Sequence, residues 1–106
     1  MDVRDFCLDL EGATETFPFG PETPVMKASN GKVFAILSDP GAPVQTVSAK
    51  ADPEDATALR DQYAAITPGY HLNKKHWITV ELDGSVPDDL VEEILAESHR
   101  LVRPRL

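Results

Sequence analysis

The sequence of 106 residues contains a single cysteine, Cys7, so no disulfide bond can form within the chain. That scarcity is typical of a protein in a reducing compartment or of one indifferent to redox state. No stretch approaches the roughly 18 apolar residues that span a bilayer. The first residues also lack the basic start and long apolar core of a signal peptide. We therefore expect a cytoplasmic protein with no membrane partner.

Basic residues are also scarce, with ten Lys and Arg against eighteen Asp and Glu, for a formal net charge of −8. A nucleic-acid-binding domain usually carries a basic face, so this balance argues against strong non-specific DNA affinity. The acids are unevenly distributed, however. Residues 1–24 carry a net −5 and residues 87–97 another −5, which leaves +2 for the other positions. A phosphate-bearing partner must therefore approach the middle of the chain.

Recognisable catalytic and metal-binding patterns are absent from the sequence. The six glycines are isolated, so there is no glycine-rich phosphate loop. His71 and His76 lie five residues apart without supporting cysteines, which is not a metal-ligand spacing. Cys7 lies between Asp5 and Asp9, whose charge is the wrong sign to stabilise a thiolate. We expect no catalytic residue, no metal and no cofactor, and hence a protein that is not an enzyme.

Hydrophobic periodicity and turn residues divide the chain into eight elements of a single domain covering residues 1–106. The expected helices are residues 2–10, residues 53 to about 62, and a last helix introduced by Ser85–Asp88, which resembles a capping box. The expected strands are 24–29, 32–38, 44–50, 66–70 and 76–82, with a hairpin turn at Asn30-Gly31.

The resulting order α-β-β-β-α-β-β-α predicts an α+β fold, a two-layer α/β sandwich in which an antiparallel sheet carries its helices on one face. The opposite face is then exposed and is a candidate interaction surface. The segment Thr16–Pro21 cannot be regular helix because of its prolines. We expect its aromatic residues, Phe17 and Phe19, to pin this loop onto the core.

The most distinctive segment is 68–77, with the sequence PGYHLNKKHW. Between Tyr70 and Trp77 it carries two lysines and two histidines and no acid, a basic island in an acidic protein. The two aromatic rings are suited to stack on bases, and Lys74 and Lys75 to contact phosphates. The alternative interpretation is a solvated loop that leads into a strand, with Trp77 buried.

Several strings of the sequence occur together in one family. They are FPFG at 17–20, GKVFA at 31–35, Lys50 with Pro53-Glu54, PGYHLNKKHWITV at 68–80, and Ser98 with Leu101-Val102. On these strings the chain resembles, over nearly its whole length, the MmcQ/YjbR family of small bacterial proteins. The resemblance implies a CyaY-like or secretion-chaperone-like fold and the family's label of a double-wing DNA-binding domain.

The resemblance carries over no catalytic residue. The matching positions that serve as candidate nucleic-acid-binding residues are Lys50, Tyr70, His71, Asn73, Lys74, Lys75, His76 and Trp77. We therefore expect a non-enzymatic binding module that takes DNA weakly and in a salt-sensitive manner, as a monomer or weak dimer. One alternative is a protein-interaction or chaperone-like domain that uses the open sheet face. Another is a small-molecule or enzymatic role for residues 70–77.

Overall fold

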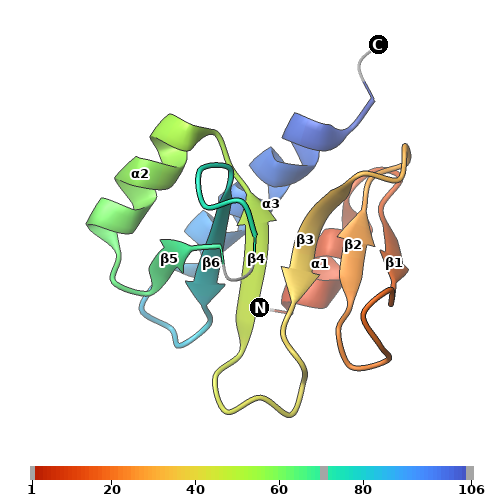
Figure 1. The fold of residues 1–106 in the computed structure, drawn as a ribbon, viewed down its shortest axis with the longest axis horizontal. Coiled ribbons are helices and arrows are strands. Elements are labelled where there is room, and N and C mark those ends of the chain that lie inside the picture. Colours follow the sequence, from red (N-terminus) through yellow and green to blue (C-terminus); the bar gives the residue numbers. More distant parts are fainter. Residues whose placement is uncertain (1, 70–71, 105–106) are drawn as a thin grey trace.

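The computed structural model describes residues 2–69 and 72–104, which form three helices and six strands (Figure 1). The helices are α1 (Val3–Asp9), α2 (Pro53–Gln62) and α3 (Asp88–Val102). The strands are β1 (Thr14–Thr16), β2 (Val25–Lys27), β3 (Val33–Leu37), β4 (Thr46–Lys50), β5 (Ile66–Pro68) and β6 (Trp77–Glu81). In this part of the chain no helix is long and apolar enough to cross a membrane.

The six strands form one sheet in the order β1-β2-β3-β4-β6-β5, and every neighbouring pair is antiparallel. Figure 1 shows α1 and α3 together behind the sheet, whereas α2 packs at the side formed by β5 and β6. The predicted α+β class is confirmed. The structure has one strand more than the predicted order, because β1 was not foreseen.

β1 is a three-residue edge strand without an apolar alternation that would have revealed it. Its residues are Thr14, Glu15 and Thr16, and Thr16 is paired with Val25 of β2. The Thr16 hydroxyl also donates a hydrogen bond to the Val25 carbonyl at 3.2 Å. Backbone pairing and a threonine hydroxyl, rather than burial of large side chains, therefore hold this edge.

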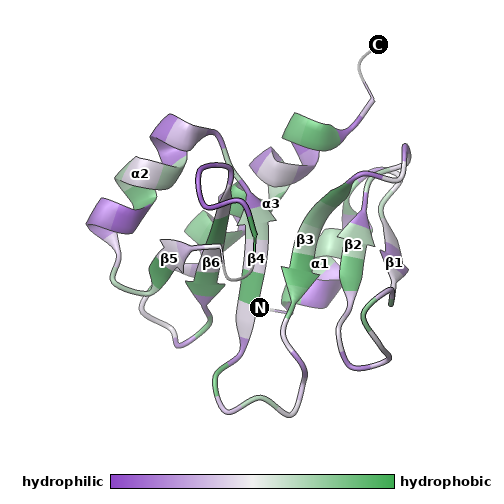
Figure 2. Cartoon of the chain, in the orientation of Figure 1, coloured by the Kyte–Doolittle hydropathy of each residue, from purple (hydrophilic) through white to green (hydrophobic). Residues whose placement is uncertain are grey.

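The core lies between the sheet and the helices, and the hydropathy colouring of Figure 2 shows it as green stretches along β3, β6 and α3. Buried side chains supplied by the strands are Met26, Ala35, Val47, Ala49, Ile78 and Val80, and those supplied by α3 are Val91, Ile94, Leu95 and Val102. Fully burying a side chain the size of Val, Ile, Leu or Met contributes about 1.5–3 kcal/mol to folding. This layer fixes the positions of the strand ends.

Ser98 of α3 is completely buried and joins the ends of β3 and β4. Its hydroxyl accepts a hydrogen bond from the Lys50 N–H at 2.8 Å and donates one to the Phe34 carbonyl at 2.6 Å. The two strands are paired directly only as far as Ala35 and Ala49. The hydroxyl thus connects the two strands beyond their last direct pair and fixes the backbone from which the Lys50 side chain extends.

The carboxyl end of α3 is held at the same end of the sheet by two further polar contacts. The Asn30 side-chain amide, in the β2–β3 turn, donates to the Val102 carbonyl at 2.7 Å. His99 is buried, lies edge-on against Phe34 with ring centroids 5.1 Å apart, and has its Nε2 2.9 Å from the Glu11 carbonyl oxygen. His99 therefore ties α3 to the residues that follow α1.

Candidate nucleic-acid interface

All five lysines of the chain lie at one end of the strands. β2 ends at Lys27, β3 begins just after Lys32, β4 ends at Lys50, and β6 begins just after Lys74 and Lys75. Because these strands are neighbours and antiparallel, the four positions meet at the same edge of the sheet. At about 4.8 Å between strands, the lysines spread over about 14 Å. We call this set of five residues the lysine end.

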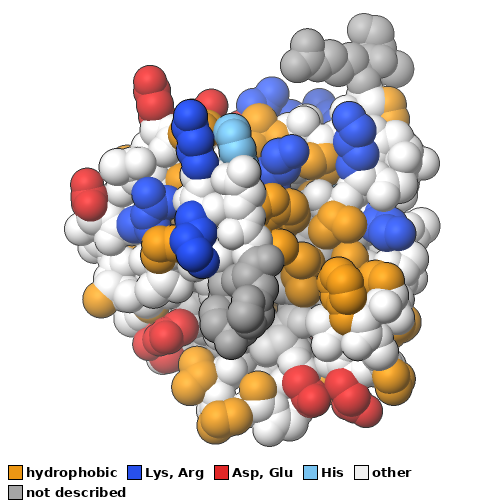
Figure 3. Space-filling model, viewed as in Figure 1, with side chains coloured by type: hydrophobic (Ala, Val, Ile, Leu, Met, Phe, Trp, Pro, Cys, Tyr) orange, Lys and Arg blue, Asp and Glu red, His pale blue; other side chains and the backbone are white. Residues whose placement is uncertain are grey.

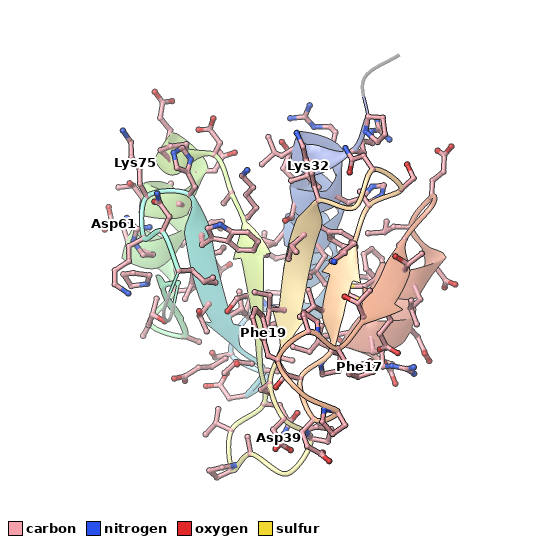
Figure 4. All side chains as sticks on the ribbon, turned by 45° about the vertical axis from the view of Figure 1, so that its right-hand side comes forward. Phe17, Phe19, Lys32, Asp39, Asp61 and Lys75 are labelled. Atoms are coloured by element: carbon pink, nitrogen blue, oxygen red, sulfur yellow. The ribbon has the colours of Figure 1, made fainter. Side chains whose placement is uncertain are left out.

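The opposite end of the same strands is acidic. The acids that flank it are Glu22 before β2, Asp39 after β3, Glu81 at the end of β6, and Asp83. Figure 3 shows Lys and Arg side chains over the upper half of this face and acids along its lower border. In Figure 4, Lys32 and Lys75 lie at the top and Asp39 at the bottom. The acids of α2 are the exception: its first turn is acidic, and Figure 4 shows Asp61, in its last turn, in the upper part of the view with Lys75.

None of the five lysines forms an ion pair within residues 2–69 and 72–104. Two arginines, in contrast, are neutralised by neighbouring carboxylates. Arg4 donates to Glu15 at 2.7 Å and Arg100 to Glu97 at 2.8 Å, and these hydrogen bonds hold the pKa of each carboxyl below its ordinary value. Arg60 and Arg103 also form no ion pair in the described residues, but the lysine end is the place where five unpaired cations gather.

The connection between β5 and β6 presents Lys74 and Lys75 from a hydrogen-bonded turn. The Asn73 side-chain oxygen accepts from the Lys75 N–H at 2.9 Å, so this amide shapes the turn. The Lys74 ammonium donates to the Gly69 carbonyl at 2.9 Å and closes the same connection. Lys74 keeps two further N–H donors for a ligand. Asn73 and Lys74 therefore support the turn that carries both lysines.

Trp77 is half-buried and stands outside the core cluster. It is the register partner of Lys50 across β4 and β6, so the two residues lie side by side on the sheet. The strand alternation places Trp77 with Thr79, on the face opposite to the core residue Ile78. The His76 carbonyl accepts from the Ala51 N–H at 2.8 Å, which ties the start of β6 to the end of β4.

The structure thus brings together Lys50, Lys74, Lys75, His76 and Trp77 of the predicted site, and Asn73 shapes the turn that precedes Lys75. The candidates Tyr70 and His71 lie outside the described residues. Sequence reasoning missed Lys27 and Lys32. Both lysines lie next to predicted strand ends, but that position indicates a shared site with Lys50 only once the strand order is known.

The sheet face away from α1 and α3 holds a groove of 490 Å³ that runs from the centre of the sheet to Ser38 and Thr46, at the end opposite the lysine end. Its floor includes Ser48 and Thr79, whose hydroxyl oxygens share a hydrogen bond at 2.9 Å. Ile36, the register partner of Ser48, lies in the same row of the floor, and Phe19 and Leu72 line the groove from the β1–β2 and β5–β6 connections. Ser48 and Thr79 are each only 8% exposed, so this face is partly covered by residues of the β1–β2 and β5–β6 connections rather than bare.

The aromatic residues after β1 do not pin their loop to the core, so that expectation was wrong. Phe17 is 45% exposed and Phe19 is 70% exposed. The physical reason is that Val25 and Met26, at the start of β2, are already fully buried beside this loop. The two phenyl rings are left on the surface, which is an unusual position for large apolar side chains near a groove.

A larger cleft, of 730 Å³, lies between α2 and α3 on the helical side of the molecule. Its lining combines apolar residues such as Leu59 and Ile94 with the carboxylates of Asp55, Glu93 and Glu97, and it also includes the cations Lys50, Arg100 and Arg103. These carboxylates would repel a polyanion. Because the cleft mixes carboxylates with cations, it is a poorer match to phosphate than the lysine end.

Nucleophiles and metal ligands add little to the site. Cys7 is fully buried, and desolvation raises the pKa of its thiol to about 12, so the folded protein offers no thiolate there at neutral pH. Within the described part of the chain, no three His, Cys, Asp or Glu side chains gather as a metal site would require. The chemistry that the described surface does offer is cationic and aromatic.

Comparison with known sequences gives one family and several relatives. The sequence model of a family described as YjbR matches residues 8–101. The Escherichia coli O157:H7 protein YbdF is 36% identical over 101 residues, which are 94% of this chain and 80% of YbdF. The Escherichia coli K12 protein YjbR is 46% identical over 54 residues, about half of each chain.

Two solved structures share the fold. The crystal structure of the Deinococcus radiodurans protein DR2400 is 45% identical with a TM-score of 0.87, covering 95% of this chain and 75% of that protein. A crystal structure from Pseudomonas syringae is 29% identical with a TM-score of 0.83, covering 97% of this chain and all of that one. None of these four names states an activity or a ligand.

Proposed function

This chain belongs to the YjbR family, and the names of the relatives compared above state no activity. From the chemistry of its surface, we propose that the protein is a non-enzymatic binding module for nucleic acid. The observation that carries the proposal is the gathering of all five lysines, without ion pairs in the described residues, at one end of the sheet. In this proposal the phosphate backbone runs across the lysine end, and Trp77 offers a ring beside Lys50.

The number of lysines sets the expected salt dependence. Each phosphate neutralised by a lysine adds about 0.7 to the slope of log affinity against log salt for a single strand, and about 0.9 for a duplex. Five contacts therefore correspond to a slope of about −3.5 to −4.5. The net charge of −8 opposes binding at long range, so we expect low affinity that is measurable mainly at low salt.

The test compares two double variants that lose the same formal charge. Lys74→Gln with Lys75→Gln removes two residues of the lysine end, whereas Arg4→Gln with Arg100→Gln removes two arginines already paired with carboxylates. Fluorescence anisotropy with labelled DNA over a salt series should show the slope reduced by about 1.4–1.8 in the lysine variant only. Equal losses in both variants, or no binding by the unmodified protein at low salt, would contradict the proposal.

The second candidate is a protein-interaction module on the same sheet face. The specific observation in its favour is the exposure of Phe17 and Phe19, of which Phe19 lines the groove. A pull-down from lysate with and without nuclease separates the two functions. Partners retained after nuclease, and lost when Phe19 is replaced by Ala, favour the protein-interaction function.

A further inference from the structure

We infer that the nucleic acid held at the lysine end is single-stranded, and that one of its bases enters the groove beside Phe19. This inference rests on the proposed function and names the substrate class of the same surface. It starts from the groove of 490 Å³, a size within the range of about 300–1,000 Å³ that small-molecule sites occupy.

The groove combines the two kinds of surface that a nucleobase presents. Phe19, Ile36 and Leu72 give it an apolar lining that suits the faces of a heteroaromatic ring. Ser48 and Thr79 place hydroxyl groups on the floor, where the polar edge of a base would arrive. Few convergent polar groups on an apolar lining are typical of a site for a planar polar ligand.

The end of the groove at Ser48 lies at the right distance from the lysines for one nucleotide to contact both. Ser48 is two residues before Lys50 on β4 and on the same face of the strand, a separation of about 7 Å. That separation is comparable with the reach from a phosphate, across its sugar, to the base. A backbone phosphate at Lys50 therefore leaves its base above the groove.

The exposed phenyl rings supply the stacking partner that a single strand requires. Phe19 is 70% exposed and lines the groove, and Figure 4 shows Phe17 and Phe19 on the same loop, below Lys32 and Lys75. Aromatic side chains that stack on bases, next to a basic track for the backbone, are the usual construction of single-strand binding surfaces. Trp77 offers a second ring beside Lys50.

A duplex fits this surface poorly for two reasons. Its bases are paired and stacked, so none can enter the groove without being flipped out. Its second backbone would also approach the acidic end of the sheet, where Asp39 follows β3 and Glu81 ends β6. The five-residue strands put that end only about 17 Å from the lysines.

The experiment compares three labelled probes at low salt: a single-stranded oligothymidine, the same length with abasic sites, and a duplex. We expect the single strand to bind at least about fivefold more tightly than either of the others, from the stacking of one base. Phe19→Ala should abolish that preference, and Phe19→Trp should retain it.

The side chain of Phe19 is largely exposed, so both Phe19 variants are expected to fold. The matched control, Val44→Ala, removes another exposed apolar side chain away from the groove and should change nothing.

Equal affinity for the single strand and the duplex, or an unchanged preference in Phe19→Ala, would overturn the inference. If the Lys74 and Lys75 variant still weakens binding in that case, the proposed function stands without a base in the groove. If no probe binds at low salt, the proposed function fails as well.

Discussion

Ser98 holds two strands and one helix together with a single buried hydroxyl. Ser98→Ala leaves the Lys50 N–H and the Phe34 carbonyl without this partner in a buried environment. Each unsatisfied group costs about 1–3 kcal/mol, so we expect the free energy of unfolding to fall by about 2–6 kcal/mol. Urea denaturation followed by circular dichroism measures this. Ser85→Ala, which removes an exposed hydroxyl bonded to Asp83, should cost less than about 1 kcal/mol.

Cys7 predicts a dependence of stability on alkaline pH. Burial raises the pKa of its thiol from 9.0 to about 12, so the folded state keeps its proton where the unfolded state loses it. This contribution to stability is present in full below pH 9 and is lost as the pH rises toward 12. We expect the stability difference between the wild type and Cys7→Ala to shrink over that range. A difference that is constant with pH would count against a buried, protonated thiol.

Reagents that attack thiolates offer a second measurement on Cys7. At pH 8 only about one folded molecule in ten thousand carries the thiolate, given a thiol pKa of about 12. We expect the reaction of a chromogenic disulfide reagent with Cys7 of the native protein to be limited by the rate at which the protein unfolds. The same reagent should react rapidly once the protein is denatured.

The hairpin of β5 and β6 depends on a glycine at its closing position. A Cβ added at Gly69 would lie 2.6 Å from the Cβ of Trp77 and 3.2 Å from that of Leu72. We expect Gly69→Ala to cost about 1–3 kcal/mol, because the backbone of the hairpin must move apart. Gly41→Ala is the control, because its Cβ would meet only the Asp39 carboxylate oxygen, at 3.3 Å.

Thermal unfolding of these two glycine variants, monitored by circular dichroism, tests the role of close packing at the hairpin. Equal melting temperatures for both variants would show that the hairpin tolerates the added methyl group. A selective loss in Gly69→Ala that also reduces DNA binding would link the hairpin geometry to the presentation of Lys74 and Lys75.

Most elements could be predicted from local sequence, and the exceptions have local physical causes. The Asn30-Gly31 signal gave the β2–β3 hairpin correctly, and Gly31 has a φ of 82° that favours glycine. The expected capping box at Ser85 was wrong. The helix instead begins after Pro87 with no side-chain cap, and the Ser85 hydroxyl bonds to Asp83. β1 was missed because its pairing, rather than its composition, makes it a strand.

At the scale of the whole molecule, part of the candidate site was not predicted because its residues are far apart in the sequence. The segment ending at Trp77 and the separate Lys50 were identified because they carry distinctive residues. Lys27 and Lys32 join them only through the strand order, which the sequence alone left open. The exposure of Phe19 was likewise not predictable, since it depends on Val25 and Met26 already filling the core beside that loop.

Because charge is separated along the strands, the electrostatic field that a partner meets at the lysine end differs from that of a uniform net charge of −8. In physiological salt, electrostatic interactions decay over about 8 Å, whereas the protein measures 34 × 32 × 25 Å and its two strand ends lie about 17 Å apart. A ligand in contact with the lysine end is therefore shielded from the acids at the opposite end of the strands. At lower ionic strength the whole molecule acts as an electric dipole. Its field then rotates the lysine end toward an approaching polyanion, so that orientation precedes contact.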